Sequence, residues 1–298
     1  MSSSSSSISS PPPTVTLICS VCGEKSSLRC SNCLGALYCS VECQKKDWKT
    51  HKVICKKAQE VKKSYEALGY RTVEEIDALL EEERRLAELG NAEAQYNLGL
   101  SYSNGLGVSV DKVESVKWYR LAAEQGFAHA QFNLGNAYFN GEGVSVDKVE
   151  AIKWYRLAAN QGDAQAQCNL GNAYFNGEGV SVDKVEAIKW YRVAANQGYA
   201  QAQFTLGVAY SNGEGISIDK VEGVKWYRLA AELGQADAQF YLGLSYLVGV
   251  GVDIDKVEGM KWIKLAAKNG CTQANKYMES LNEEQIWPLV SNLSCNLT

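Results

Sequence analysis

Histidine and proline are both scarce in this chain of 298 residues. Three of the four prolines stand together at residues 11–13, so almost all of the remaining sequence is free to form helices. Only two histidines occur, which leaves little material for a histidine-based catalytic triad. No stretch approaches the roughly 20 consecutive apolar residues that a membrane-spanning helix needs. These shortages favour a helical protein with no membrane partner.

An excess of positive charge is also absent. The 30 basic side chains are outnumbered by 34 acidic ones, and the net charge of −4 argues against a nucleic-acid partner. The N-terminal residues have neither the basic start nor the apolar run of a secretory signal. We therefore expect an intracellular protein, cytoplasmic or nuclear, and not a secreted one.

Cysteine, by contrast, is concentrated. Seven of the ten cysteines lie between residues 19 and 55, and in a reducing compartment such a cluster indicates metal binding before disulfides. With one histidine they form four pairs, separated by two or three residues. The eight candidate ligands are Cys19, Cys22, Cys30, Cys33, Cys39, Cys43, His51 and Cys55. Eight ligands are enough for two tetrahedral zinc sites.

The order of these ligands, with Tyr38 before Cys39 and Trp48 before His51, resembles the MYND zinc finger. The resemblance implies a cross-braced finger with two structural zinc ions. Alternate pairs share a metal, so that one zinc is held by Cys19, Cys22, Cys39 and Cys43. The other is held by Cys30, Cys33, His51 and Cys55. Fewer than 40 residues cannot build an adequate core, so interlocked metals make physical sense here.

MYND fingers generally bind short proline-containing peptides of partner proteins. By that resemblance Gln44 and Trp48 are candidate partner-binding residues, although Trp48 equally fits a place in the finger's own core. The lysines around them raise nucleic acid as an option. The lack of interleaved aromatic residues and the acidic character of the whole chain favour a solvated helix instead.

The rest of the sequence repeats itself. Five units of 36 residues begin at residues 91, 127, 163, 199 and 235, and a fragment from residue 271 begins a sixth. A fixed period of this length is the signature of a solenoid. Each unit predicts two helices, the first ended by Asn-Gly (Val248-Gly249 in the last unit) and the second begun by an aspartate such as Asp183. A glycine inside each first helix, such as Gly171, predicts a close approach, which we place under the tryptophan of the same unit.

The run Ala-x-Ala-Gln-x-x-Leu-Gly-x-x-Tyr, followed by Asp-Lys-Val-Glu and Lys-Trp-Tyr-x-x-Ala-Ala, resembles the SEL-one-like repeat, a relative of the tetratricopeptide repeat. This resemblance implies an all-α fold, a right-handed α/α solenoid preceded by the small finger. We expect a disordered Ser/Pro-rich tail over 1–14, the finger over 19–55 and a helical linker or cap over 56–90. Five repeats occupy 91–270, and a partial sixth repeat with a C-terminal tail occupies 271–298.

One face of each first helix remains after its two apolar stripes are assigned to the core. By resemblance to tetratricopeptide arrays this face lines a concave groove. Asparagines dominate it in the second and third units, and their side chains both donate and accept hydrogen bonds, as an extended peptide requires. The candidates are Asn133, Asn136, Asn140, Asn169, Asn172 and Asn176. A solvated face without a ligand is the alternative, and His129 is interpreted as a solvated substitution.

The two modules together predict an adaptor or scaffold that is not an enzyme. The finger is expected to dock one protein and the solenoid another, through short peptide motifs. The alternatives are a component of ubiquitin-dependent quality control or degradation, and a MYND-type transcriptional corepressor. Neither the partners nor the oligomeric state follow from the sequence.

Overall fold

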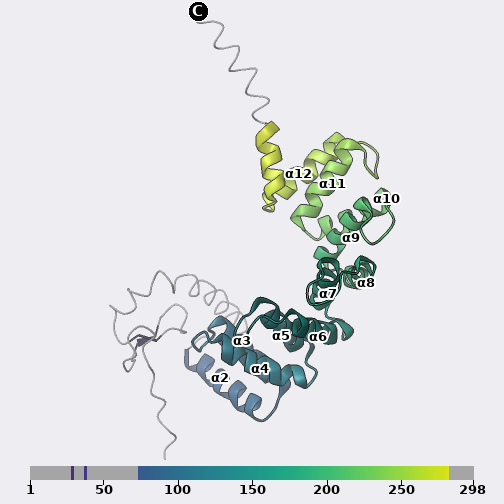
Figure 1. The fold of residues 1–298 in the computed structure, drawn as a ribbon. Helices are drawn as coiled ribbons and strands as arrows, with labels where there is room; N and C mark the ends of the chain where they lie inside the picture. The colour runs from purple at the N-terminus through teal and green to yellow at the C-terminus, as the bar shows by residue number, and fades with distance from the viewer. Residues whose placement is uncertain (1–27, 30–36, 39–72, 282–298) are drawn as a thin grey trace, which may run out of the picture. The chain divides into compact units, whose positions relative to one another are not determined.

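The computed structural model describes residues 28–29, 37–38 and 73–281 (Figure 1). Two compact units divide the chain at residue 122, and each is considered by itself. The Ser/Pro-rich tail, Thr72 and most of the finger lie outside the described residues. Among the described residues no helix is both long and apolar enough to cross a membrane.

The first unit contains a small hairpin and the start of the helical array. Strand β1 (Leu28–Arg29) pairs antiparallel with β2 (Leu37–Tyr38), a feature that the sequence did not predict. Three helices follow: α2 (Val73–Glu88), α3 (Ala92–Asn104) and α4 (Lys112–Glu124), which ends just beyond the boundary. Helix α2 packs against α3. Within residues 56–90, where a helical linker or cap is expected, the structure describes α2.

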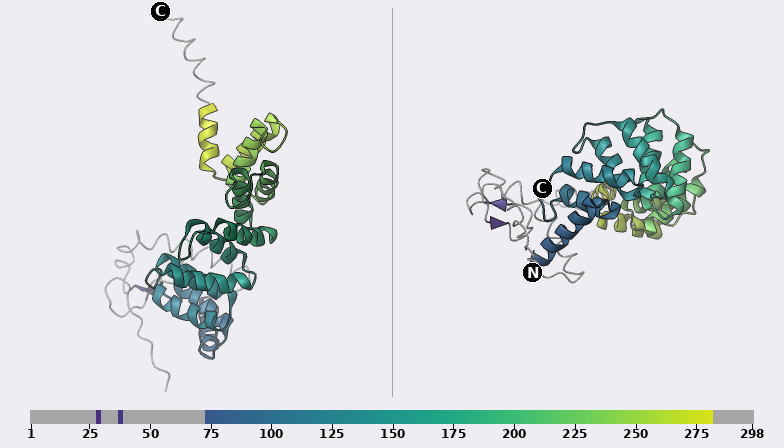
Figure 2. Two further views of the ribbon diagram at one scale, coloured as in Figure 1. Left: turned by 45° about the vertical axis from the view of Figure 1, so that its right-hand side comes forward. Right: turned by 90° about the horizontal axis from the view of Figure 1, so that it is seen from below.

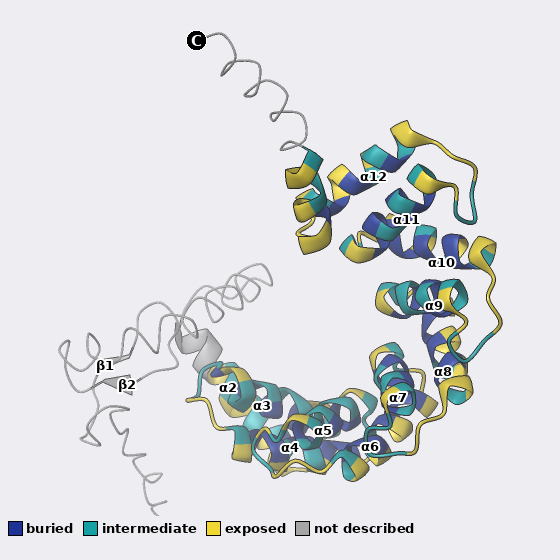
Figure 3. Cartoon of the chain, turned by 45° about the horizontal axis from the view of Figure 1, so that its top comes forward, coloured by how far each residue is buried: buried dark blue, intermediate teal, exposed yellow. Residues whose placement is uncertain are grey.

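The second unit is a stack of helical hairpins (Figures 1 and 2). Each hairpin packs against the next through its second helix, so α6 contacts α7, α8 contacts α9, and α10 contacts α11. The hairpins follow a curved path, with buried residues where helices face one another (Figure 3). This is the right-handed α/α solenoid predicted from the repeats. Its helices are α5 (Ala128–Asn140), α6 (Lys148–Asn160), α7 (Ala164–Asn176), α8 (Lys184–Asn196), α9 (Ala200–Asn212), α10 (Lys220–Glu232), α11 (Ala236–Val248), α12 (Lys256–Lys268) and a further helix over 272–281.

Helix ends follow the predicted signals. Gly177 ends α7 in the left-handed conformation, with φ of 75°, and its N–H donates to the carbonyl of Ala173. Asp183 begins α8, and its side chain accepts a hydrogen bond from the main-chain N–H of Glu186 at 2.9 Å. The side chain of Glu186 binds Lys189 at 2.7 Å. The aspartate cap is thus confirmed, while the glutamate belongs to a surface ion pair.

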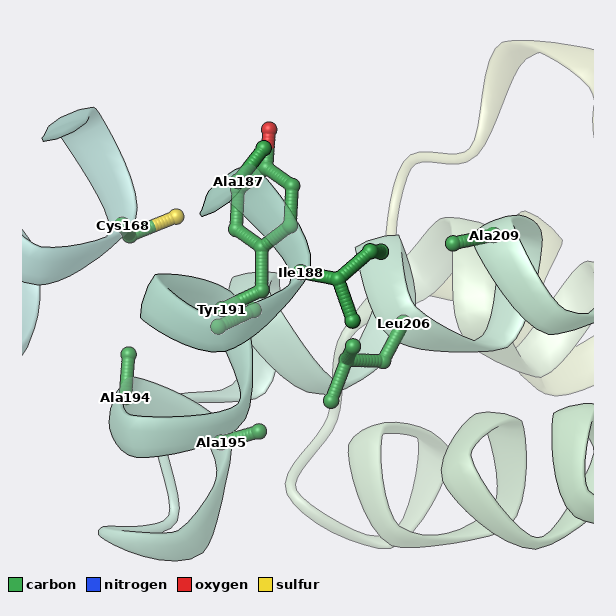
Figure 4. Packing of buried hydrophobic residues seen from close by; sticks show 9 residues of the cluster. Cys168, Ala187, Ile188, Tyr191, Ala194, Ala195, Leu206 and Ala209 are labelled. Atoms are coloured by element: carbon green, nitrogen blue, oxygen red, sulfur yellow. The ribbon is translucent and has the colours of Figure 1, made fainter. Parts of the chain in front are cut away.

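The glycine inside the first helix of a repeat faces a tyrosine in the first four repeats and Ile263 in the last, and the predicted contact with tryptophan is wrong. A methyl group on Gly171 would lie 2.6 Å from a ring carbon of Tyr191, which is 2% exposed. Figure 4 shows this ring beside Cys168, Ala187 and Ile188, with which it belongs to one buried cluster. The neighbouring Trp190 instead packs on the cluster shared by α6 and α7. Because successive residues of a helix point in different directions, the tyrosine packs within its hairpin and the tryptophan joins two hairpins.

Buried glutamines fasten each hairpin to the next. The Nε2 group of Gln167 donates to the main-chain oxygen of Ala159 at 3.0 Å. Its Oε1 atom accepts from Gln197, 30 residues further along, at 2.7 Å. Gln131 and Gln239 are held in the same way, by Gln161 and Asn269. We call this repeated arrangement the glutamine ladder.

The glutamine ladder is interrupted at one position. Residue 233, which corresponds to Gln197 in the preceding hairpin, is leucine and is 59% exposed. As a result the buried Oε1 atom of Gln203 accepts no hydrogen bond within the described chain. A buried acceptor without a donor costs about 1–3 kcal/mol.

Replacing Leu233 by glutamine is expected to stabilise the protein by about 1 kcal/mol, because the new amide reaches Gln203 as Gln197 reaches Gln167. The backbone angles at 233 (φ −80°, ψ 1°) match those at Gln197 (φ −81°, ψ 0°), so no rearrangement is needed. Urea denaturation measures the change. The control variant Leu233→Ala removes the exposed leucine without adding a donor. Equal stabilities of the two variants would contradict the prediction.

Candidate protein-binding groove

Two first helices, α5 and α7, lie on either side of a groove of about 300 Å³. Seven helical positions and one loop glutamate line it, and five of the eight residues are asparagines. We call this feature the asparagine groove. Its lining residues are Asn136, Phe139, Asn140, Tyr155, Asn169, Asn172, Asn176 and Glu178.

Tyr155 fixes the orientation of one carboxamide in the groove. Its hydroxyl donates to Oδ1 of Asn136 at 2.7 Å, and the same oxygen also lies 3.4 Å from Nδ2 of Asn169. Burial raises the pKa of the Tyr155 phenol well above its usual value, so the hydroxyl keeps its proton and acts as the donor. The Oδ1 atom of Asn136 is therefore engaged within the protein.

Tyr191 fixes the orientation of the equivalent carboxamide in the next hairpin. Its hydroxyl donates to Oδ1 of Asn172 at 2.8 Å, and burial again raises the phenol pKa. Thus Asn136 and Asn172, which lie at equivalent positions of α5 and α7, are held in equivalent ways. The two carboxamides form a matched pair along the groove.

The charges near the groove compensate one another. Glu178 accepts an ion-pair hydrogen bond from Nζ of Lys148 at 2.7 Å, and this nitrogen lies 4.9 Å from the centre of the Phe139 ring. The remaining lining side chains are carboxamides, a phenol and a phenyl ring, all neutral. The groove consequently offers hydrogen bonds and one partly exposed ring, and no net positive charge for a polyanion.

Five of the six predicted asparagines line the groove. Asn133 is half-buried on α5 and is not among the lining residues. The sequence did not identify Phe139, Tyr155 or Glu178, although a tyrosine follows the tryptophan in the first four repeats, at a fixed distance from the groove positions. That recurrence is the signal that could have found Tyr155.

The corresponding positions of α9 and α11 are less polar. Val208 and Leu244 replace the paired asparagines, and Tyr241 stands where α7 has Asn169. Tyr241 packs on Phe204 and Tyr227, with ring centres 5.6 Å apart in both cases. The side chain of His129, the histidine of the repeats, is 67% exposed, and its Nδ1 atom lies 3.3 Å from Oδ2 of Asp163. Its exposure is consistent with the interpretation of His129 as a solvated substitution.

All eight zinc ligands, together with Gln44 and Trp48, lie outside the described residues. Within residues 73–281 no group of three or more histidine, cysteine or acidic side chains is arranged to hold a metal ion. Cys168 is an isolated thiol, and burial raises its pKa to about 12, so it stays protonated at neutral pH.

Two family profiles match the sequence. The MYND finger profile covers residues 19–55. The Sel1 repeat profile matches five times in succession, over residues 92–127, 128–163, 164–199, 200–235 and 236–271.

Solved structures support the repeat fold. A Sel1 repeat protein from Oxalobacter formigenes is 40% identical, with a TM-score of 0.60 over 62% of this chain and 74% of that one. The uropathogenic Escherichia coli protective antigen c5321 is 36% identical, with a TM-score of 0.69 over 83% of this chain and 52% of that one.

Curated relatives match over short segments. Tudor domain-containing protein 1 of Mus musculus is 45% identical over 49 residues, which are 16% of this chain and 4% of that protein. Ubiquitin carboxyl-terminal hydrolase 19 of Arabidopsis thaliana is 50% identical over 42 residues, 14% of this chain and 6% of that protein. The chain therefore spans only a small part of the length of these relatives.

Proposed function

Because the chain belongs to the Sel1 repeat family and carries a MYND finger, we propose that it is an adaptor whose finger docks one protein and whose solenoid docks another. Both modules are of kinds that bind proteins. Joining two modest sites raises the effective concentration of one partner near the other. We place the adaptor inside the cell, where its thiols stay reduced.

The observation that carries the proposal is the asparagine groove. Five carboxamides side by side supply donors and acceptors without net charge, which suits the alternating N–H and C=O groups of a peptide main chain. A nucleic acid would need positive charge, and the lysine beside the groove is already paired with Glu178. The solenoid partner is thus proposed to be an extended protein segment.

The finger is proposed to hold two structural zinc ions through the eight predicted ligands. By resemblance to the MYND finger, Cys39 and Cys30 are assigned to different zinc ions. Four protein ligands at each ion leave no open position for water, so the zinc would be structural and not catalytic.

Affinity capture with mass spectrometry tests the adaptor. The intact chain is compared with Cys39→Ala, with the groove variant Asn136→Ala/Asn172→Ala, and with the control Asn160→Ala/Asn196→Ala. The control asparagines are exposed at the ends of α6 and α8 and are not groove residues. We expect one set of partners to be lost with the finger variant and another with the groove variant. The proposal would be contradicted if neither the finger variant nor the groove variant lost any partner.

The identity of the captured partners also separates the alternatives. A co-purified ubiquitin ligase would favour a degradation role, and nuclear retention of the chain would favour corepression. Transfer of a chemical group by the purified chain would overturn the expectation that it is not an enzyme.

A further inference from the structure

A lysine begins the second helix of each hairpin, and in two hairpins the loop of the following hairpin pairs its charge. Nζ of Lys148 lies 2.7 Å from Oε1 of Glu178, and Nζ of Lys184 lies 3.1 Å from Oε2 of Glu214. The ammonium group of Lys184 also lies 4.4 Å from the centre of the Phe175 ring. In these hairpins the lysine is therefore held by a carboxylate from the next hairpin and by an aromatic ring from its own.

Lys220, which begins α10, has neither of these partners. Ser211 stands where the preceding hairpin has the phenylalanine, and Val250 stands where the other loops have the glutamate. Within residues 73–281 no acidic side chain forms an ion pair with Lys220, whose side chain is exposed. The array thus keeps the cation at this position and lacks both groups that hold it elsewhere.

The backbone beside Lys220 keeps the geometry of the paired hairpins. A methyl group added to Gly215 would overlap the main-chain carbonyl of Lys184, and one added to Gly251 would overlap that of Lys220 in the same way. Both glycines have a φ of +72°. The residue before each glycine therefore lies beside the lysine of the preceding hairpin, and before Gly251 this residue is Val250. The position beside Lys220 is one that receives a carboxylate in the neighbouring hairpins.

The side chains around this position are apolar. Val248, the last residue of α11, is 64% exposed, whereas α5, α7 and α9 end in an asparagine. Leu244 and Tyr241 lie on the same face of α11, one and two turns earlier, and are half-buried, as is Val250. We call these four residues the α11 apolar stripe. A single exposed apolar residue needs no explanation, but a stripe that ends beside an unpaired cation marks an interaction surface.

A ligand that satisfies both features carries a carboxylate next to apolar side chains. A nucleic acid would offer phosphate without the apolar side chains, and a basic segment would meet Lys220 with charge of the same sign. We propose that Lys220 and the α11 apolar stripe form a second protein-binding site of the solenoid, which takes a partner segment with an acidic residue beside leucine-like side chains. This site lies outside the asparagine groove and adds to the proposed function, so that either site can fail alone.

Fluorescence anisotropy with a labelled nonapeptide of three Glu-Leu-Leu units tests the proposal. The binding variant Val250→Glu supplies an internal carboxylate, which pairs with Lys220 as Glu214 pairs with Lys184 and so competes with the peptide. The matched control Val250→Gln removes the same valine without adding a charge. We expect Val250→Glu to weaken binding at least fivefold relative to Val250→Gln.

A second pair of variants removes the cation instead. Lys220→Met keeps a side chain of similar length and is expected to weaken binding at least fivefold. Lys184→Met is its control, because Lys184 is already paired with Glu214, and it is expected to change binding less than twofold. Both lysines are exposed, so neither change disturbs the core. A peptide of three Lys-Leu-Leu units is expected to bind at least tenfold less tightly than the acidic peptide.

The inference is overturned if the parent chain does not bind the Glu-Leu-Leu peptide, or if it binds the Lys-Leu-Leu peptide equally well. Equal binding by Val250→Glu and Val250→Gln, with Lys220→Met unchanged, also overturns it. A last contrary result is binding that Asn136→Ala/Asn172→Ala abolishes and Lys220→Met leaves unchanged. The peptide would then occupy the asparagine groove, and the proposed function would stand without a second site.

Discussion

Replacing Gly179 by alanine is expected to destabilise the second unit by about 3 kcal/mol. Gly179 has φ of +71°, where a side chain costs about 1–2 kcal/mol, and its added methyl group would overlap the carbonyl of Lys148 in the preceding hairpin. That carbonyl belongs to the main chain of α6 and cannot rotate away, so the overlap adds roughly 1–3 kcal/mol. Urea denaturation followed by circular dichroism measures the loss.

Gly198→Ala is the matched control. Gly198 also has a positive φ, +84°, but nothing lies within 4 Å of the added methyl group. It is expected to cost only about 1 kcal/mol, the backbone part of the effect. The difference between the two variants then measures the contact between hairpins. If both variants lose the same stability, the close approach of Gly179 to α6 is not energetically important.

Replacing Cys39 by alanine is expected to unfold the finger. Structural zinc supplies about 10–16 kcal/mol to small zinc domains, which have too little core to fold without it. In the cross-braced arrangement the loss of one ligand loosens segments that hold both ions. Elemental analysis of reduced protein should therefore fall from about two zinc ions per chain to one or fewer, while the helical signal of the repeats is retained.

Cys168→Ala is the control for this measurement. Cys168 is 2% exposed inside the repeats, so its replacement leaves a small cavity and removes no zinc ligand. Its zinc content should match that of the parent chain. A Cys39→Ala protein that still holds two zinc ions would show that Cys39 is not a ligand.

Much of the solenoid could be predicted from the sequence because each repeat contains the residues that begin and end its two helices. Asparagine and glycine end the first helix, aspartate begins the second, and the same signals recur every 36 residues. The groove asparagines could also be predicted, since subtracting the two apolar stripes of a helix leaves only one face. Five of the six then proved to line a single groove.

Contacts between helices could not be predicted in the same way. Periodicity gives the direction of a side chain on its own helix but not the residue that it meets on another. For this reason Gly171 was paired with tryptophan instead of Tyr191, and the glutamine ladder was missed. The donor for Gln167 lies 30 residues away, at the end of the second helix of the same hairpin, and no local pattern indicates it.

The hairpins of the second unit pack in chain order, each on its immediate neighbours, and this has a consequence for the gene. Unequal crossing-over would insert or delete one complete unit. The hairpins on either side would then still pack on each other through equivalent surfaces. The second and third units differ at only four positions, so the surfaces that they present to their neighbours are almost the same. Chains with one unit more or fewer should therefore keep the same packing between hairpins, in a longer or shorter array.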